Sequence, residues 1–356
     1  MAINVLHIAK DFDLVSGITR YISTLLKLFR DDKEYKLHLI VNRGDAIKSN
    51  LDYGFSIKEI PFKVGIRGFS GFLTAQKKIG KYCIENNIDI IHTHHRYPEL
   101  IASQISKRNG IKTITTAHSI VTGFKSFSFR SDKIIAVSNY VSQYLIEKFQ
   151  IPKEKMVVLN NCIQNEYENE TNTRDQNKSS DLNSKIILLY AGRFSKEKGT
   201  DILLETFELL KEKYNIELWL LGMNYDLKLK SYYDKSIKII SPVADIENIY
   251  NQADIFILPS KVDPFPYFML EAGLFQKPFI GSRAGGIAEF IEDGVDGFLV
   301  NPEDIFDLKE KIEFVINNLS ETRETGNRLY KKVIEKCNCE NYFYALKNIY
   351  KELLNS

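Results

Sequence analysis

Two acidic residues stand close together in one stretch of this sequence, and two basic residues stand upstream of them. Asp263 and Glu271 are eight positions apart, Asp263 in a Pro-rich segment and Glu271 in a helical pattern. Arg193 and Lys198 are five positions apart in a Gly-flanked segment. Basic side chains bind phosphate oxygens, whereas carboxylates accept hydrogen bonds from hydroxyl groups. The combination predicts a pocket for a sugar linked to a diphosphate.

The basic residues follow a predicted strand that ends at Ala191, and they precede a helix predicted to begin near Thr200. The first turn of a helix has free backbone N–H groups and the positive end of the helix dipole. After the turn at Gly192, Arg193 adds a planar fork of donors and Lys198 adds a point charge. Together they could stabilise negative charge on a leaving diphosphate. A basic loop that caps a surface helix is the alternative interpretation.

The acidic residues are predicted to meet the sugar parts of the same ligand. Glu271 lies near the first turn of a helix that starts after Tyr267, so its carboxylate could accept hydrogen bonds from two neighbouring hydroxyls, as a ribose presents them. Asp263 lies in the preceding loop, where the prolines have no N–H, so Phe265, Tyr267 and Phe268 supply the available backbone donors. Two alternatives stay open: general acid/base hydrolysis by the carboxylate pair, and a solvated helix face for Glu271.

A glycine pair at Gly285 and Gly286, followed by Glu289, opens another predicted helix. The glycines would let the backbone approach a ligand closely, and the helix N-terminus could donate to phosphate or sugar oxygens. Alternatively, Glu289 is a first-turn carboxylate that stabilises the helix dipole.

In the first half of the chain, Gly17 follows the first predicted strand and begins a helix that could receive a phosphate in the same way. His92, His94 and His95 cluster at the end of a predicted strand, and His118 follows the next one. No acidic trio nearby completes a metal site, so we expect no metal and neutral imidazoles that bond to sugar or phosphate oxygens. His118 is the best candidate of the four, because a loop follows it.

Parallel strands covered on both faces must position these residues. Apolar runs rich in Ile and Val alternate with helical patterns, which is typical of an α/β fold with parallel sheets. Ligands of such sheets bind outside the carboxyl ends of the strands. The predicted strands are 5–9, 35–41, 57–60, 88–93, 113–116, 133–137, 156–159, 186–191, 217–221, 237–240, 255–258, 278–281 and 297–300, and the first-half helices are 18–29, 72–86, 97–108 and 139–149.

We expect two Rossmann-like domains that face a central cleft. Residues 1–165 form the first domain and residues 186–340 the second. The segment 166–185 is dominated by polar residues, cannot bury a core, and is predicted to be a linker. Residues 341–356 carry the pattern of an amphipathic helix.

Composition narrows the class of protein. The 356 residues are 44% hydrophobic and 26% charged, as in globular proteins, and no stretch approaches the roughly 20 apolar residues of a membrane helix. Cys83, Cys162, Cys337 and Cys339 have no matching Cys or His pair for a zinc site. We therefore expect reduced thiols and a cytoplasmic location.

The charge is unevenly distributed. Residues 1–165 carry 24 Lys and Arg against 14 Asp and Glu (+10), and the remaining residues carry 24 against 32 (−8), which sums to +2. A basic first half suggests an anionic partner such as the inner face of the cytoplasmic membrane, although chance drift between domains would give the same pattern. Segments 62–81 and 124–130 mix Phe with Lys and Arg, which fits peripheral membrane contact, stacking on nucleic acid or core packing. We expect membrane contact and no nucleic acid.

Taken together, these residues resemble a GT-B glycosyltransferase of the large retaining family of polysaccharide and lipopolysaccharide sugar transferases, often called GT4 or glycosyl transferases group 1. The resemblance covers essentially the whole chain and is strongest over 186–300. There the Gly-Arg-x5-Gly segment, the acidic-x7-Glu motif and the Gly-Gly-x-x-Glu turn occur in the family's order. Gly17 and His118 match its N-terminal glycine loop and histidine.

The resemblance implies a role for each site residue. Arg193 and Lys198 would bind the diphosphate of a UDP- or GDP-linked sugar, with Glu271 on the ribose. Asp263 and the backbone from Phe265 to Phe268 would surround the transferred sugar, and the backbone near Ile240 would face the base. It also implies a glycan or lipid-linked acceptor, retention of configuration, no metal or other cofactor, and a last helix that packs back on the first domain.

The sequence departs from the family pattern at three places. Asp263 stands where Glu is usual, Pro264 where Gly is usual, and Asn161 and Cys162 alter the family's Asn-Gly segment. These changes leave the sugar preference open. A sugar-nucleotide epimerase of the same fold and a non-catalytic sugar-nucleotide-binding protein are the alternatives. A dinucleotide-dependent oxidoreductase is disfavoured because no Gly-x-Gly-x-x-Gly follows the first strand.

Overall fold

A computed structural model describes residues 2–13, 16–44, 57–62, 69–165, 185–224, 235–242 and 246–356. Its contacts divide the chain into two compact units. Unit 1 comprises Met1–Cys162 and Cys339–Ser356, and unit 2 comprises Ile163–Asn338. Most of the predicted linker, 166–184, lies outside the described residues, as do Lys63 and Arg67 of the first aromatic and basic segment.

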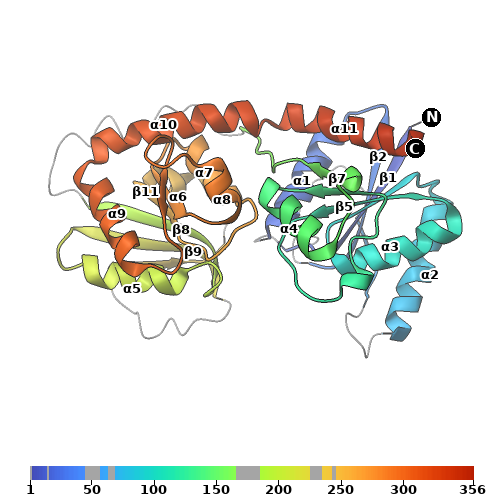
Figure 1. Ribbon diagram of the computed structural model, residues 1–356, viewed down its shortest axis with the longest axis horizontal. Helices are drawn as coiled ribbons and strands as arrows, with labels where there is room; N and C mark the ends of the chain where they lie inside the picture. Colours follow the sequence, from blue (N-terminus) through green and yellow to red (C-terminus); the bar gives the residue numbers. More distant parts are fainter. Residues whose placement is uncertain are drawn as a thin grey trace. The chain divides into compact units, whose positions relative to one another are not determined.

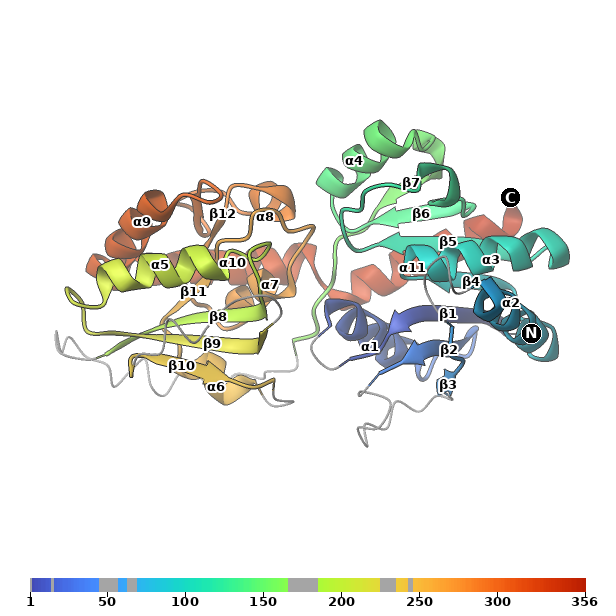
Figure 2. The same cartoon turned by 90° about the horizontal axis from the view of Figure 1, so that it is seen from below.

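Unit 1 is built on a seven-stranded parallel sheet with the order β3-β2-β1-β4-β5-β6-β7 (Figure 2). This order, in which the chain reverses direction across the sheet beside β1, is that of a Rossmann-like domain. All seven strands had been predicted. Their bounds are β1 Ile3–Asp11, β2 Tyr35–Arg43, β3 Ile57–Glu59, β4 Ile90–Thr93, β5 Lys112–Ala117, β6 Lys133–Ala136 and β7 Met156–Val158.

The two faces of this sheet are lined differently, because side chains alternate along a strand. Leu6 and Ile8 of β1 pack into an apolar cluster with α2 and α3, whereas His7 between them is fully buried on the other face, toward α1 and α11. Figure 1 shows these helices around the first sheet. Their bounds are α1 Gly17–Phe29, α2 Phe69–Glu85, α3 Arg96–Asn109 and α11 Cys339–Asn355.

The segment after β5 carries two short elements before α4 (Asn139–Phe149) begins, a 3₁₀ turn at Lys125–Phe127 and β6. Buried Glu99 of α3 holds the segment's end by accepting the backbone N–H groups of Phe129 (2.7 Å), Arg130 (2.5 Å) and Ser131 (3.2 Å). Ser138 caps α4 by accepting from the Val141 N–H at 3.2 Å, as its sequence position predicts. The ring of Phe129 is buried and packs edge-on against that of Phe149, so core packing is confirmed for Phe129.

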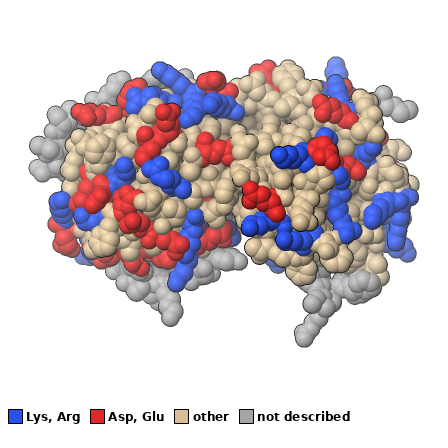
Figure 3. All heavy atoms as spheres, viewed as in Figure 1, with Lys and Arg blue, Asp and Glu red and all other residues tan. Residues whose placement is uncertain are grey.

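Phe124 and Phe127 differ from Phe129, because their side chains are exposed. Core packing is wrong for these two residues of the second aromatic and basic segment. In the other segment Phe62 is buried and Phe72 packs on the core. Figure 3 shows both basic and acidic side chains on each of the two units. None of the described helices is long and apolar enough to cross a membrane.

Unit 2 contains a six-stranded parallel sheet in the order β10-β9-β8-β11-β12-β13, which repeats the Rossmann-like topology. All six strands had been predicted, although β8 and β9 are longer than expected. The bounds are β8 Ile186–Phe194, β9 Ile216–Asn224, β10 Ile237–Ile240, β11 Ile255–Leu258, β12 Phe279–Ser282 and β13 Phe298–Val300.

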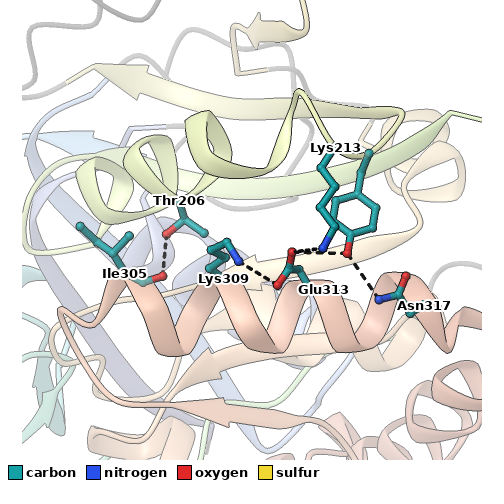
Figure 4. Close-up of polar contacts among 7 residues, drawn as sticks. Thr206, Lys213, Ile305, Lys309, Glu313 and Asn317 are labelled. Atoms are coloured by element: carbon teal, nitrogen blue, oxygen red, sulfur yellow. Dashed lines mark hydrogen bonds and ion pairs between the residues drawn. The ribbon is translucent and has the colours of Figure 1, made fainter.

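Helices cover this sheet in two packed pairs, α5 with α9 and α7 with α10. Figure 4 shows the polar side of the first pair, where Glu313 of α9 accepts from Lys213 at 2.9 Å and from Lys309 at 2.8 Å, and Thr206 of α5 donates to the Ile305 carbonyl at 3.4 Å. This packing fixes α5, which begins two residues after Lys198. The bounds are α5 Thr200–Leu210, α6 Glu247–Gln252, α7 Tyr267–Leu274, α8 Gly285–Phe290, α9 Ile305–Asn317 and α10 Leu319–Lys336.

The chain crosses between the units at two adjacent points in unit 1. All four cysteines are buried and none is in a disulfide. The Sγ atom of Cys162, the last residue before unit 2, lies 3.0 Å from Sγ of Cys339, the first residue after it. Sequence spacing gave no sign of this contact across 177 positions.

Candidate functional site

The first basic residue of the predicted site belongs to a strand rather than to a loop. Gly192 pairs with Gly222 and Arg193 pairs with Met223, so β8 continues three residues beyond the predicted end at Ala191. A Cβ atom on Gly222 would lie 1.9 Å from the Gly192 carbonyl oxygen, so the glycine permits the close approach of the two strands there. The Arg193 side chain therefore leaves the end of a paired strand, which is a firmer base than a loop.

The turn between β8 and α5 is anchored from within and from below. The Ser195 carbonyl accepts the N–H groups of Lys198 (3.1 Å) and Thr200 (3.2 Å). Gly199 has a φ of 68°, and a Cβ atom there would lie 1.9 Å from the carbonyl oxygen of Pro259, just after β11. The turn thus rests against the carboxyl end of the neighbouring strand, which fixes where α5 begins.

Lys198 and Asp263 form an ion pair that the sequence analysis did not foresee. The Lys198 Nζ atom lies 2.6 Å from Asp263 Oδ2, with 17% and 7% of the two side chains exposed. Arg193 differs, since 48% of its side chain is exposed and its contact to Glu197 is 3.7 Å. A basic loop that only caps a surface helix is therefore the wrong interpretation for Lys198, which is bound to the acidic loop.

The glycine pair supports that acidic loop from below. The Gly286 N–H donates to the Asp263 carbonyl at 2.8 Å. Cβ atoms on Gly285 and Gly286 would lie 2.2 Å from the Asp263 carbonyl oxygen and 2.0 Å from the Pro264 carbonyl oxygen. The close approach expected for a ligand is thus made to the protein's own backbone. Glu289 of α8 is exposed.

Glu271 is buried in α7 and is held by Tyr250 of α6, whose hydroxyl donates to Glu271 Oε2 at 2.6 Å. The alternative of a solvated helix face is wrong for this residue. The rings of Phe265 and Phe268 are buried too, Phe268 stacked on Phe256 at 5.0 Å, so these residues can offer a ligand only their backbone. Ile240 is a half-buried residue at the end of the edge strand β10.

In unit 1, Gly17 is exposed as the first residue of α1, and the preceding Ser16 makes no side-chain capping bond. The α1 side chain of Tyr21 packs edge-on against the ring of His118 at 4.7 Å. His118 follows β5 as predicted and is half-buried. The structure therefore places His118 beside the helix that Gly17 begins.

His118 is the outer member of a histidine cluster whose inner member the sequence analysis missed. His94 Nδ1 lies 3.2 Å from His118 Nε2, and His94 Nε2 lies 3.0 Å from His7 Nδ1. His95 does not belong to this row of hydrogen-bonded histidines, since its Nδ1 accepts from the Lys10 N–H at 3.1 Å. A polar residue in the otherwise apolar β1 run was the available signal for His7.

Burial keeps these imidazoles neutral. It lowers the pKa of His7 and of His118 to about 3 and that of His95 to about 4, with smaller contributions from neighbouring charges. Burial also lowers the pKa of His92 and His94 well below the usual value. The expected neutral imidazoles are thus consistent with their surroundings.

His7, His92 and His94 are close enough to be compared with a metal site, since one ligand atom of each lies within 4.8 Å of the others. Both nitrogens of His92 already have partners, however, with Tyr350 Oη at 2.7 Å and Thr116 Oγ1 at 2.7 Å. Both nitrogens of His94 are also within hydrogen-bond distance of histidines. A metal ion would have to displace these contacts.

Both halves of the chain are similar to known glycosyltransferases. The model "Glycosyltransferase Family 4" matches residues 15–167, and "Glycosyl transferases group 1" matches residues 172–332. An uncharacterized glycosyltransferase of Methanocaldococcus jannaschii is 27% identical over 361 residues, which cover 96% of each chain. A capsular polysaccharide biosynthesis glycosyltransferase of Staphylococcus aureus is 27% identical over 259 residues, 66% of this chain and 67% of that protein. The crystal structure of Anabaena HepE in complex with UDP-glucose superposes with a TM-score of 0.84 at 16% identity, covering 98% and 99% of the two chains.

The support of the acidic loop by Gly285 can be tested with a matched pair of substitutions. Gly285 and Gly294 both have positive φ, 59° and 78°, but a Cβ atom would meet the Asp263 carbonyl oxygen only at Gly285, whereas Gly294 faces open space. Gly294→Ala should cost about 1–2 kcal/mol from backbone strain alone. Gly285→Ala should cost about 1–3 kcal/mol more. Urea unfolding followed by fluorescence of the single Trp219, in β9, measures both, and equal costs would contradict this support.

The buried histidines predict acid sensitivity. Their folded pKa values lie below the unfolded value of about 6.5, so the stability they contribute is fully present above that pH and is lost as pH falls toward the folded values. Each group should remove about 1.4 kcal/mol per pH unit in this window. Urea unfolding at pH 7 and pH 5, followed by far-UV circular dichroism, should show a lower free energy of unfolding at pH 5. The His7→Leu variant should show a smaller difference between the two pH values. An equal free energy of unfolding at both pH values would contradict the neutral, buried state of these histidines.

Proposed function

This chain belongs to the group 1 glycosyltransferases, enzymes of the GT-B fold, and on that premise we propose that it transfers a sugar from a UDP- or GDP-linked donor to a hydroxyl of a glycan or lipid-linked acceptor with retention of configuration. The observation that supports the donor most directly is in unit 2. There an exposed guanidinium, Arg193, stands at the end of β8 beside a turn whose Lys198 is bound to Asp263.

We propose that these groups divide the donor between them. Arg193 offers a planar fork to the diphosphate oxygens, and Lys198, oriented by Asp263, adds positive charge where the leaving diphosphate gains negative charge. Buried Glu271, already oriented by Tyr250, would accept from the ribose hydroxyls. The UDP-glucose bound to the Anabaena structure, whose fold this chain shares, supports a nucleotide-sugar donor.

The remaining predicted contacts are backbone or neutral ones. Phe265 to Phe268 would supply N–H groups around the transferred sugar, with the base near Ile240. Gly192 and Glu289 would complete the donor set of unit 2, whereas Gly286 would act through the Asp263 loop that it supports. In unit 1, Gly17 and His118 would contact donor oxygens. In this proposal the basic groups of the chain replace a metal ion, and the acceptor attacks from the face of the leaving group.

For the acceptor, we propose a growing surface polysaccharide or lipopolysaccharide, processed in the cytoplasm at the inner face of the membrane. The name of the Staphylococcus aureus relative supports the polysaccharide. The exposed Phe124 and Phe127, in one segment with Lys125 and Arg130, support contact with an anionic membrane. A sugar-nucleotide epimerase would act without any acceptor, and a binding protein would not turn the donor over.

Arg193→Ala tests the proposed diphosphate contact. Transfer from UDP- and GDP-linked hexoses to lipid-linked acceptors should fall about 10²–10³-fold in kcat, the cost of removing one such donor from a transition state. Arg193→Lys should be intermediate, because it keeps the charge and loses the fork. Arg328→Ala on α10, whose side chain is 41% exposed and pairs with Glu324, is the matched control.

NMR of the product's anomeric centre decides between retention and inversion in the same assay. Full activity of Arg193→Ala, or an inverted product, would contradict the proposal. Conversion of the donor without any acceptor would favour the epimerase.

A further inference from the structure

The buried histidines of unit 1 form a directed chain that ends at His118. His7 belongs to β1, His94 follows β4 and His118 follows β5, so three neighbouring strands align them. His7 and His94 stack with an interplanar angle of 7°, and the two hydrogen-bond distances along the chain are 3.0 Å and 3.2 Å. Each contact joins two ring nitrogens, so each needs one N–H donor and one lone pair.

A neutral imidazole carries one N–H, and this couples the three tautomers. Both nitrogens of His94 are engaged, so His94 accepts on one side and donates on the other. Only two arrangements satisfy both contacts. The protons point either from His7 through His94 to His118, or from His118 through His94 to His7.

The inner end of the chain distinguishes the two arrangements. His7 is buried, and its Nε2 atom has no hydrogen-bond partner among the described residues. If the protons pointed inward, His7 Nε2 would carry a buried N–H without an acceptor, which costs about 1–3 kcal/mol. If they point outward, Nε2 is an unpaired acceptor, and under-satisfied acceptors are tolerated better than orphaned donors.

We propose that His7 and His94 fix His118 as the Nδ1–H tautomer, so that His118 presents a hydrogen-bond donor and not a base. In the outward arrangement His7 Nδ1–H donates to His94 Nε2, and His94 Nδ1–H donates to His118 Nε2. The proton of His118 is then on Nδ1, which makes no hydrogen bond within the part of the chain that the structure describes. His7 and His94 are positioning residues.

No charged side chain, whether Asp, Glu, Lys or Arg, is hydrogen-bonded to the three aligned histidines among the described contacts. The neighbouring titratable groups are Tyr21, His38, His92 and His95, and burial lowers the pKa of each of these three neighbouring histidines. Because His92 is satisfied by Tyr350 and Thr116, it is not drawn into the chain.

The ligand class follows from the donor. Nδ1–H of His118 fits an oxygen acceptor, such as a hydroxyl oxygen of the sugar or a diphosphate oxygen, and this part of the inference rests on the proposed function. The tautomer itself does not, because it is a property of the ligand-free protein.

The direct test is NMR of the full-length, ligand-free protein labelled with ¹⁵N in histidine. Two-bond correlations from the ring protons distinguish the tautomers, and single His→Gln variants assign the six histidines. We expect protonated Nδ1 and unprotonated Nε2 for His7, His94 and His118 at neutral pH. Protonated Nε2 on His118 would overturn the proposal.

Two variants probe the control of the tautomer. His94→Leu removes the donor to His118 Nε2 and should give a mixture of His118 tautomers. His38→Gln is the control, because His38 is a buried histidine on β2 whose partner is Tyr82 at 2.9 Å, outside the chain. It should leave the His118 signals unchanged. Unchanged His118 signals in His94→Leu would refute the relay, and so would stoichiometric Zn²⁺ binding that shifts the signals of His7, His92 and His94.

Transfer activity then tests the ligand contact separately. An Asn amide nitrogen occupies the place of Nδ1 and a Gln amide nitrogen that of Nε2. His118→Asn should therefore exceed His118→Gln in kcat/KM by about tenfold, equivalent to one neutral hydrogen bond. The reverse order would contradict Nδ1–H donation. If the wild type shows the expected His118 tautomer but catalyses no sugar transfer, the tautomer proposal stands and the proposed function is contradicted.

Discussion

The ion pair between Lys198 and Asp263 is the interaction on which the unit 2 site depends. Two nearly buried opposite charges are stable only if their geometry is well fixed, because desolvation offsets much of their attraction. The protein fixes both partners through glycines. Gly199 sets the turn of Lys198 against β11, and Gly285 and Gly286 hold the Asp263 loop from below. Arg193 is left exposed beside them as a cation that a ligand can reach.

Unit 1 presents the opposite kind of chemistry. Its candidate groups are neutral, because burial between the sheet and helices α1 and α11 lowers the histidine pKa values. Hydrogen bonds among rings, and with Tyr and Thr hydroxyls, replace ion pairs there. Among the candidate site residues, the charged side chains Arg193, Lys198, Asp263 and Glu271 thus belong to unit 2, where a diphosphate is proposed to bind, and the neutral histidines belong to unit 1.

Much of the fold could be predicted from the sequence, because buried parallel strands appear as continuous apolar runs and helical patterns separate these runs. The errors came from contacts between distant residues. The end of β8 depends on its pairing with β9, and the role of the glycine pair depends on a loop some twenty residues earlier in the chain. Likewise, Glu271 was recognisable as a candidate, but its burial and Tyr250 partner were not. His7 was overlooked because one polar residue in a strand carries no spacing signal.

The central claim, that the basic groups of unit 2 bind the diphosphate of a nucleotide, is tested most directly by thermal unfolding with UDP, GDP, ADP or CMP. Wild type and Arg193→Ala are compared. A ligand at 100 times its dissociation constant should add about 2.7 kcal/mol of stability. The account predicts selective stabilisation by one nucleoside diphosphate, weakened in the variant, which would also identify the donor base. Equal stabilisation of wild type and variant, or none by any nucleotide, would contradict it.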